Sequence, residues 1–203
     1  MNKKSLQIIY SVIIGLAGFG AFYVINKQVQ FPARTDSTLT STLNVNENST
    51  PEMRPYDAQR DKEFIKRQFK ENWNMLISSP DYSIDDMLDN NSPHKSDTKH
   101  RGKLITKVLY YQGEQAGFGS CYMDTDVRGD ILFVEVDKNF RGKKLAETIV
   151  KTQIEDLKNL GAKTVKLCTR VDNFIAQKLY TRLGFKETHR SKSHVYYRID
   201  LSL

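Results

Sequence analysis

The amino-acid sequence predicts an α/β fold, a mixed sheet with helices on its faces, preceded by an N-terminal transmembrane helix. Residues 6–25 form an apolar run without a single charge. From about residue 53 the periodicity indicates two helices, three strands, a long helix, a strand, a short helix and two strands. The 203 residues are 39% hydrophobic and 10% aromatic, which is enough for one packed domain with a segment left over.

The apolar run, "LQIIYSVIIGLAGFGAFYVI", is long enough to cross a bilayer as a helix. A cleaved secretory signal is the alternative, because Lys3 and Lys4 resemble the basic start of such a signal. The run is longer than a usual signal core, however, and no small-x-small cleavage site follows it. We therefore expect residues 1–27 to be a membrane anchor that contacts the lipid bilayer through residues 6–25.

The next segment, residues 34–52, is rich in Ser, Thr and Asn and almost free of bulky apolar side chains. Such a composition cannot bury enough surface to offset the entropy of ordering. We expect residues 28–52 to be a flexible linker and residues 53–203 to be the folded domain.

A short strand in "EMRPYD" and two helices open this domain. Asp57 or Asp61 can cap the first helix, whose apolar residues recur at helical spacing from residue 65 to residue 77. In "YSIDDMLDN" a second short helix is predicted, with Ser83 as its cap and Asp86 three residues later. Residues 90–102 are polar and basic, which predicts a loop.

The segments "KLITKVLYYQ" and "QAGFGSCYMD" then flank a Gly-Glu pair and predict a hairpin. "DILFVEVD" is too apolar for a strand with one wet face, so it should be central and covered on both faces. A helix from Arg141 should end at Gly161, with Ala146, Ile149, Val150, Ile154, Leu157 and Leu160 on its apolar side. "KTVKLCTRV" predicts a strand, "NFIAQKLYTRL" a helix closed by Gly184, and "FKETHR" with "HVYYRIDL" a last hairpin.

The stretch "VDKNFRGKKLAETIV", residues 136–150, places several cations at the start of a helix, where the backbone dipole is already positive. A bound phosphate or pyrophosphate would reverse that unfavourable balance, because helix N-termini offer unpaired N–H groups to anions. Gly142 lets the backbone approach such a ligand, while Arg141, Lys143 and Lys144 add cationic arms. The alternative is a solvated basic helix start that binds nothing.

These residues resemble the acyl-CoA-binding motif of the GNAT N-acetyltransferase superfamily, which matches at Val136, Phe140, Arg141, Gly142 and Ala146. Lys144 stands where the second glycine of that motif is usual, and Lys138 replaces a frequent proline. "NFIAQKLYTRLGFKET" is similar to the family's second signature, with Asn173, Ala176, Leu179, Tyr180, Gly184 and Phe185 in register. The resemblance extends over about residues 53–203.

The resemblance implies the GNAT fold and transfer of an acetyl group from acetyl-CoA to an amine, by direct attack in a ternary complex. It implies acetyl-CoA contacts at Val134, Val136, Arg141, Gly142, Lys143, Lys144, Leu145, Ala146, Asn173 and Tyr180. Asn173 would bind the pantetheine arm or cap its own helix. A non-catalytic acyl-CoA-binding or interaction module on the same fold is the alternative function.

The implied chemistry needs a neutral amine, and deprotonating a lysine of pKa about 10.4 at pH 7 costs roughly 4.6 kcal/mol, against about 1 kcal/mol for an α-amino group. Asp130 is the first candidate for the general base, since some family members carry a glutamate or histidine there. The other interpretation of Asp130 is a residue that simply ends a turn after Gly129. Glu135 is its rival; strand parity places it on the opposite face, and an acid inside a central strand implies a partner or a bulge. Backbone N–H groups near Val134 and Val136 suit the oxyanion if the strand splays there.

Tyr180 occupies the position that supplies the proton of the departing thiolate in many relatives. An ordinary core aromatic is the other interpretation of this residue.

Other site classes are not indicated. The four histidines lack ligand spacing, so we expect no metal. Cys121 and Cys168 are expected to be buried free thiols, and the family's strand order places the central strand between them. The net charge of +7 and the pI near 9.3 favour anionic partners. Basic residues are not interleaved with aromatic ones, so nucleic acid is not expected. The oligomeric state is not readable.

The orientation of the anchor rests on two opposing observations. Lys3, Lys4 and the amino terminus slightly outweigh Lys27 and Arg34, which favours a domain outside the cell. Acetyl-CoA is cytosolic, so a working enzyme should face the cytoplasm. We expect a single-pass membrane protein whose domain faces the cytoplasm.

Overall fold

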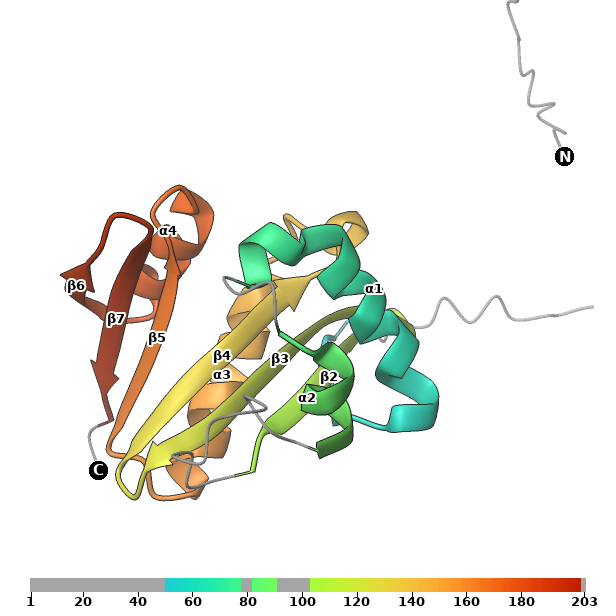
Figure 1. The fold of residues 1–203 in the computed structure, drawn as a ribbon, viewed down its shortest axis with the longest axis horizontal. Helices are drawn as coiled ribbons and strands as arrows, with labels where there is room; N and C mark the ends of the chain where they lie inside the picture. The colour runs from blue at the N-terminus through green and yellow to red at the C-terminus, as the bar shows by residue number, and fades with distance from the viewer. Residues whose placement is uncertain (1–49, 78–81, 91–102, 202–203) are drawn as a thin grey trace, which may run out of the picture. The chain divides into compact units, whose positions relative to one another are not determined.

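A seven-stranded mixed sheet organises the molecule, with the strand order β1-β2-β3-β4-β5-β7-β6 (Figure 1). The computed structural model describes residues 50–77, 82–90 and 103–201. Its strands are β1 (Glu52–Pro55), β2 (Ile105–Tyr111), β3 (Glu114–Thr125), β4 (Arg128–Val136), β5 (Thr164–Arg170), β6 (Lys186–Arg190) and β7 (His194–Asp200). Neighbouring strands are antiparallel except β4 and β5, which are parallel. The prediction of a mixed α/β sheet is confirmed.

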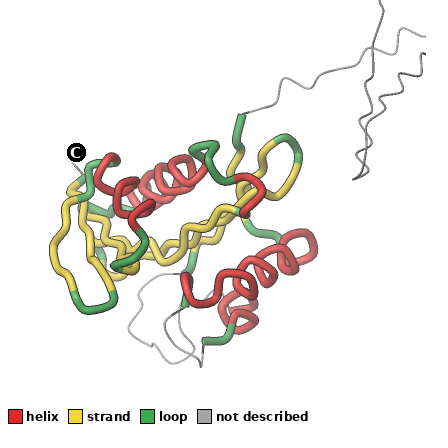
Figure 2. The backbone as a smooth tube through the Cα atoms, turned by 90° about the horizontal axis from the view of Figure 1, so that it is seen from above, coloured by secondary structure: helices red, strands yellow, loops and turns green. Residues whose placement is uncertain are grey.

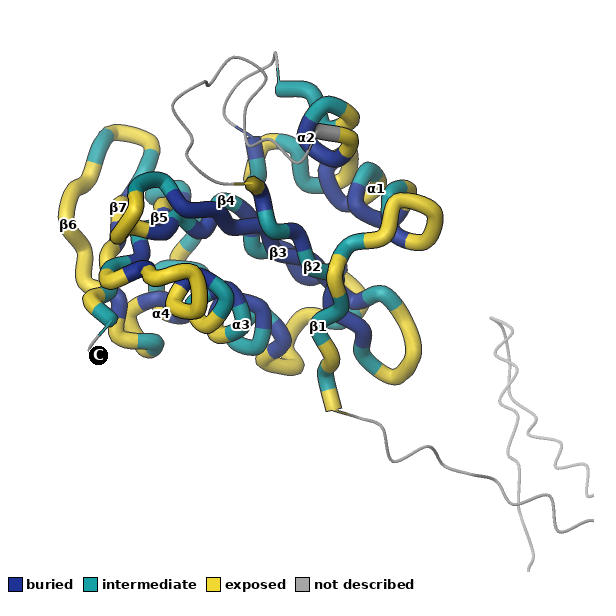
Figure 3. Tube along the Cα trace, turned by 90° about the horizontal axis from the view of Figure 1, so that it is seen from below, coloured by how far each residue is buried: buried dark blue, intermediate teal, exposed yellow. Residues whose placement is uncertain are grey.

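Helices cover both faces of the sheet (Figure 2). The helices are α1 (Ala58–Leu76), α2 (Ile84–Asn90), α3 (Leu145–Asn159) and α4 (Phe174–Arg182), with a short 3-10 turn, η1 (Lys138–Phe140), after β4. On one face α1 and α2 pack over a cluster that includes Phe69, Phe118 and Phe133. On the other face α3 and α4 share a second cluster with β5 and β7. The central strands are the most buried part of the sheet (Figure 3), as predicted for "DILFVEVD".

The helix caps follow from the sequence. Asp57 caps α1, since its Oδ1 accepts a hydrogen bond from the Arg60 N–H at 3.0 Å. The Ser83 Oγ accepts one from the Asp86 N–H at 3.2 Å before α2. Asp61 is fully buried and accepts a hydrogen bond from the Tyr110 hydroxyl at 2.7 Å, which ties α1 to β2.

The start of α3 differs from its prediction. The helix begins at Leu145, four residues after Arg141, because the residues between them form a separate turn with positive φ angles at Gly142 and Lys144. Its end is as predicted, with Gly161 at φ +94°. Leu160 is 54% exposed, so the predicted apolar side of α3 stops one turn earlier.

A β-bulge interrupts β4. Cys121 of β3 lies opposite Ile131, while Ser120 lies opposite Phe133, so one extra residue, Leu132, is inserted in β4. An inserted residue shifts the alternation of side chains, and residues on either side of it no longer follow simple parity. The prediction that Asp130 and Glu135 point to opposite faces is therefore wrong.

The two carboxylates share the face under α1 and α2, as their cross-strand neighbours show. Asp130 lies opposite Tyr122 and Glu135 lies opposite Phe118, and both aromatic residues belong to the cluster on that face.

The two cysteines are separated by β4, as predicted, and both are free thiols. Cys121 is buried, but Cys168 is exposed, so the prediction of two buried thiols is wrong for Cys168. In β5 the buried side chains of Val165 and Leu167 point into the cluster under α4. Cys168 alternates with them on the other face of the strand.

No helix in residues 50–77, 82–90 or 103–201 is both long and apolar enough to span a membrane. The predicted anchor, residues 6–25, lies outside the described residues, as does nearly all of the predicted linker.

Candidate active site

The site forms where β4 and β5 part. Their parallel pairing runs only from Arg128↔Thr164 to Ile131↔Leu167. Figure 1 shows the two strands diverging beyond this point, toward the ends that lead into η1 and α4. In the described residues, the last five residues of β4 have no strand partner on the β5 side, so backbone groups of Val134 and Val136 can reach a ligand.

The loop after β4 carries backbone angles that suit an anion. Gly142 has φ +84°, and a side chain at that position would be strained. Lys144 is the N-cap residue of α3 with φ 61° and ψ 15°, and no side chain caps the helix. The first N–H groups of α3 are therefore left without a side-chain acceptor, as a phosphate-binding turn requires.

Lys144 keeps the shape that its motif position implies. A left-handed φ is the conformation in which glycine is preferred, so the usual glycine and the lysine here serve the same turn. Lysine in place of the usual glycine raises the conformational energy of the turn, but the backbone follows the same path.

Two of the cationic side chains of this loop, Lys143 and Arg141, differ in their surroundings. The Lys143 Nζ lies 5.0 Å from the centroid of the Tyr111 ring and 5.4 Å from that of Phe140. Arg141 folds back along β4: its Nε donates to the Val136 carbonyl at 3.0 Å, and its Nη2 lies 2.8 Å from the Glu135 Oε1. Arg141 is thus held by β4, and is not the free arm that the sequence suggested.

Glu135 is the carboxylate nearest to this loop. Its side chain is only 10% exposed, and burial raises its pKa, although the hydrogen bond and charge of Arg141 oppose that shift. A buried strand acid was predicted to need a partner or a bulge, and the structure supplies both.

Asp130 lies at the closed end of the opening, in the stretch where β4 and β5 are still paired. Its Oδ2 accepts a hydrogen bond from the Tyr122 hydroxyl at 3.2 Å and lies 3.1 Å from the Lys166 Nζ. Burial raises the pKa of Asp130, against the opposing charge of Lys166. The raised pKa suits a general base better than an ordinary aspartate does.

Tyr180 on α4 packs against the rings of Phe185 and Tyr197, with centroids 6.0 and 5.9 Å away. Burial raises its pKa strongly, and the charge of Glu135 adds to the shift, so the phenol stays protonated. Tyr180 is thus a core aromatic whose phenol burial keeps protonated.

Asn173 caps α4, because its Oδ1 accepts a hydrogen bond from the Ala176 N–H at 3.1 Å. This is one of the two roles that the sequence left open.

Gln153 is a site residue that the sequence analysis missed. It is buried on α3, and its Nε2 donates to the Phe133 carbonyl at 3.0 Å, beside the bulge of β4. Gly119 makes room for it, since a Cβ there would lie 2.8 Å from the same Nε2. The feature of the sequence that could have identified Gln153 is its position as a polar residue on the otherwise apolar side of α3.

Asp137 was also missed. Its Oδ2 accepts a hydrogen bond from the Gln68 Nε2 at 2.7 Å, and its Oδ1 accepts one from the Asn139 N–H at 2.9 Å. It therefore fastens the loop before the anion-binding turn to α1. The feature of the sequence that could have identified Asp137 is an acidic residue directly after a buried strand.

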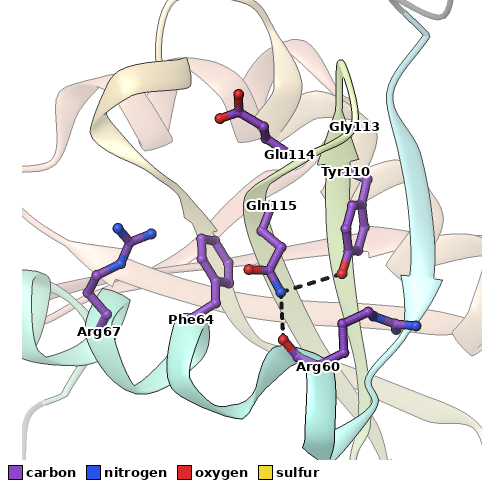
Figure 4. Close-up of a pocket in the computed structure, with 7 residues that line it drawn as sticks. All are labelled: Arg60, Phe64, Arg67, Tyr110, Gly113, Glu114 and Gln115. Atoms are coloured by element: carbon purple, nitrogen blue, oxygen red, sulfur yellow. Dashed lines mark hydrogen bonds between the residues drawn. The ribbon is translucent and has the colours of Figure 1, made fainter.

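A separate open pocket of about 440 Å³ lies between α1 and the β2–β3 hairpin (Figure 4). Arg60 and Arg67 line it, but Arg60 pairs with Asp61 and Arg67 pairs with Asp137. Gln115 reaches across it to donate to the Arg60 carbonyl at 3.1 Å. Both arginines are thus paired with carboxylates outside the lining, and we assign no chemistry to this pocket.

In the part of the chain that the structure describes, no cluster of His, Cys, Asp and Glu side chains could hold a metal ion.

A family model described as the acetyltransferase (GNAT) family matches residues 62–185, more than half of the chain. The chain belongs to the GNAT acetyltransferase family. Members of this family use acetyl-CoA. In this GNAT chain the turn between β4 and α3 leaves the helix start without a side-chain cap.

Solved structures show the same fold. Ard1 from Thermoplasma volcanium superposes with a TM-score of 0.59 at 17% identity, covering 75% of this chain and 99% of that one. A Bacillus subtilis acetyltransferase in complex with CoA superposes with a TM-score of 0.54 at 17% identity, covering 75% of this chain and 100% of that one.

Among curated proteins, N-alpha-acetyltransferase 30 of Schizosaccharomyces pombe is 38% identical over 61 residues, which are 30% of this chain. The match covers 41% of that protein, so the chain spans about two-fifths of the curated relative's length.

Proposed function

We propose that this GNAT chain is an N-acetyltransferase that moves the acetyl group of acetyl-CoA to a primary amine by direct attack in a ternary complex. The observation that carries the proposal is the opening between β4 and β5, which leads directly into an uncapped, left-handed turn. Such an opening can hold a thioester beside free backbone N–H groups while the turn holds the pyrophosphate.

The reaction forms a bond between the amine nitrogen and the acetyl carbon and breaks the bond from that carbon to sulfur. Glu135 or Asp130 accepts the proton that the attacking amine loses, and burial raises the pKa of both carboxylates toward the working range. Backbone N–H groups of Val134 and Val136 stabilise the tetrahedral oxyanion. Tyr180, whose phenol burial keeps protonated, donates its proton to the departing sulfur.

For the acceptor we propose an α-amino group of a peptide or protein. The sequence match to an N-alpha-acetyltransferase supports this choice. An α-amino group costs only about 1 kcal/mol to deprotonate at pH 7, so it demands less of a carboxylate base than a lysine does. A lysine side chain or a small-molecule amine could be acetylated by the same reaction.

Acetyl-CoA consumption with a panel of amines tests the proposal. The panel contains peptides with free α-amino groups, the same peptides blocked at the N-terminus but carrying lysine, and small primary amines. We expect turnover with at least one class. Binding of acetyl-CoA without turnover of any amine would instead support a non-catalytic acyl-CoA-binding module.

We further propose that residues 1–27 anchor the protein in a membrane, that residues 28–52 are the linker, and that the domain in residues 53–203 faces the cytoplasm. The uncharged run at residues 6–25 and the cytosolic location of acetyl-CoA support this arrangement. Protease added outside sealed membranes should leave the domain intact. Cleavage of the domain without detergent would refute the orientation, and recovery in the soluble fraction would refute the anchor.

A further inference from the structure

The Arg141 guanidinium makes three contacts within the protein. Its Nη2 lies 2.8 Å from the Glu135 Oε1 and 3.3 Å from the Asn72 Oδ1, and its Nε donates to the Val136 carbonyl at 3.0 Å. Asn72 belongs to α1 and has non-helical backbone angles within that helix. One side chain therefore joins β4, the anion-binding loop and α1.

The same residue directly precedes Gly142 in the anion-binding turn, and its side chain is 53% exposed. Glu135 is only 10% exposed, so the carboxylate is the buried partner and the guanidinium is the accessible one. A pyrophosphate diester carries two negative charges, against one on a carboxylate, and its oxygens match the planar fork of arginine. The two anions compete for one cation.

We propose that Arg141 holds Glu135 inactive in the free enzyme, and that the pyrophosphate of acetyl-CoA takes over the guanidinium and leaves Glu135 unpaired as the general base. This inference rests on the proposed function and deepens it, because it assigns the base and makes its release depend on the bound co-substrate. Asp130 keeps Lys166 and Tyr122 as partners at the closed end of the opening, where β4 and β5 are still paired.

The charges around Glu135 agree with this assignment. Asp137, directly after the end of β4, raises the pKa of Glu135, while Arg67 of α1 pairs with Asp137 at 3.2 Å. From α4, Tyr180 feels the charge of Glu135. Arg141 is thus the main cation that keeps Glu135 ionised, and its removal raises the tendency of Glu135 to hold a proton.

The exchange predicts that binding of the pyrophosphate is accompanied by proton uptake. The probe is 3′-dephospho-CoA, because the 3′-phosphate of CoA would itself titrate near pH 6 and obscure the measurement. Calorimetry of the full-length protein at pH 6.5, in two buffers of different ionisation heat, gives the affinity and the number of protons taken up. We compare wild type, Glu135→Gln, Arg141→Gln and, as a matched control, Asp124→Asn, which removes an ion-paired carboxylate that contacts Arg128 and Lys166.

We expect wild type and Asp124→Asn to take up protons on binding, and both Glu135→Gln and Arg141→Gln to lose that uptake. Glu135→Gln should also bind the probe about threefold or more tightly, because the competing carboxylate is gone. Equal proton uptake in wild type and Glu135→Gln, or weaker binding by Glu135→Gln with an unchanged melting temperature, would overturn the inference. Absence of binding by wild type would instead overturn the proposed function, and this inference with it.

Discussion

Replacing Lys144 by glycine should leave the domain as stable as wild type or more stable. Lys144 has φ 61°, and a left-handed residue with a side chain costs roughly 1–2 kcal/mol. Glycine removes that cost but loses roughly 0.5–1 kcal/mol through the greater freedom of the unfolded chain. The net effect on the free energy of unfolding is a gain of about 0–1.5 kcal/mol.

Lys143→Gly is the matched control, because it removes the same charge one residue away. Lys143 has no positive φ, so its replacement carries the entropic loss without any relief of strain. It also loses the contact of its Nζ with the Tyr111 ring at 5.0 Å, worth about 0.5–1 kcal/mol. The two variants should therefore differ by about 2 kcal/mol, with Lys144→Gly the more stable.

Urea denaturation followed by tryptophan fluorescence or circular dichroism measures this difference. Lys144→Ala separates charge from backbone, since alanine removes the cation and keeps the strain, and it should be no more stable than wild type. Equal stability of the two glycine variants, or a less stable Lys144→Gly, would refute the assignment of a strained turn at Lys144.

Three further predictions concern other parts of the site. Tyr180→Phe should lower turnover at least about tenfold while acetyl-CoA affinity stays nearly unchanged, and full turnover in a steady-state assay would remove Tyr180 from the mechanism. Gly129→Ala should destabilise the domain by about 1–3 kcal/mol, because its Cβ would lie 2.7 Å from the buried Leu157 side chain; a loss under about 0.5 kcal/mol by urea denaturation contradicts the packing. Burial raises the pKa of Asp130 above its usual 3.8, so its contribution to stability is present at lower pH and is lost as the pH rises through that higher pKa. Asp130→Asn should thus gain melting temperature relative to wild type between pH 4 and pH 7, and a constant difference would contradict this.

Much of the fold could be predicted from local patterns, because caps, periodicity and glycines act over a few residues. Asp57, Ser83 and Gly161 mark helix ends where the sequence places them. The start of α3 was missed because the charges of its loop resemble a polar first helical turn, whereas the φ angle of Lys144 depends on the whole turn. The exposure of Cys168 was missed because no local pattern tells which face of β5 a helix will cover.

The bulge in β4 explains why the site was harder to predict than the fold. Parity assigns Asp130 and Glu135 to opposite faces, and one inserted residue, Leu132, reverses that assignment for everything beyond it. The bulge comes directly after the last residue of β4 that pairs with β5. Leu132, which reverses the alternation of side chains, therefore also lies where the two strands separate. At this point the Gln153 side chain donates a hydrogen bond to the Phe133 carbonyl. In a regular strand pair, a backbone N–H could have donated to that carbonyl instead. The irregularity thus places Glu135 on the face of α1, within reach of Arg141, and a strand without it would have pointed this carboxylate into the apolar packing of α3.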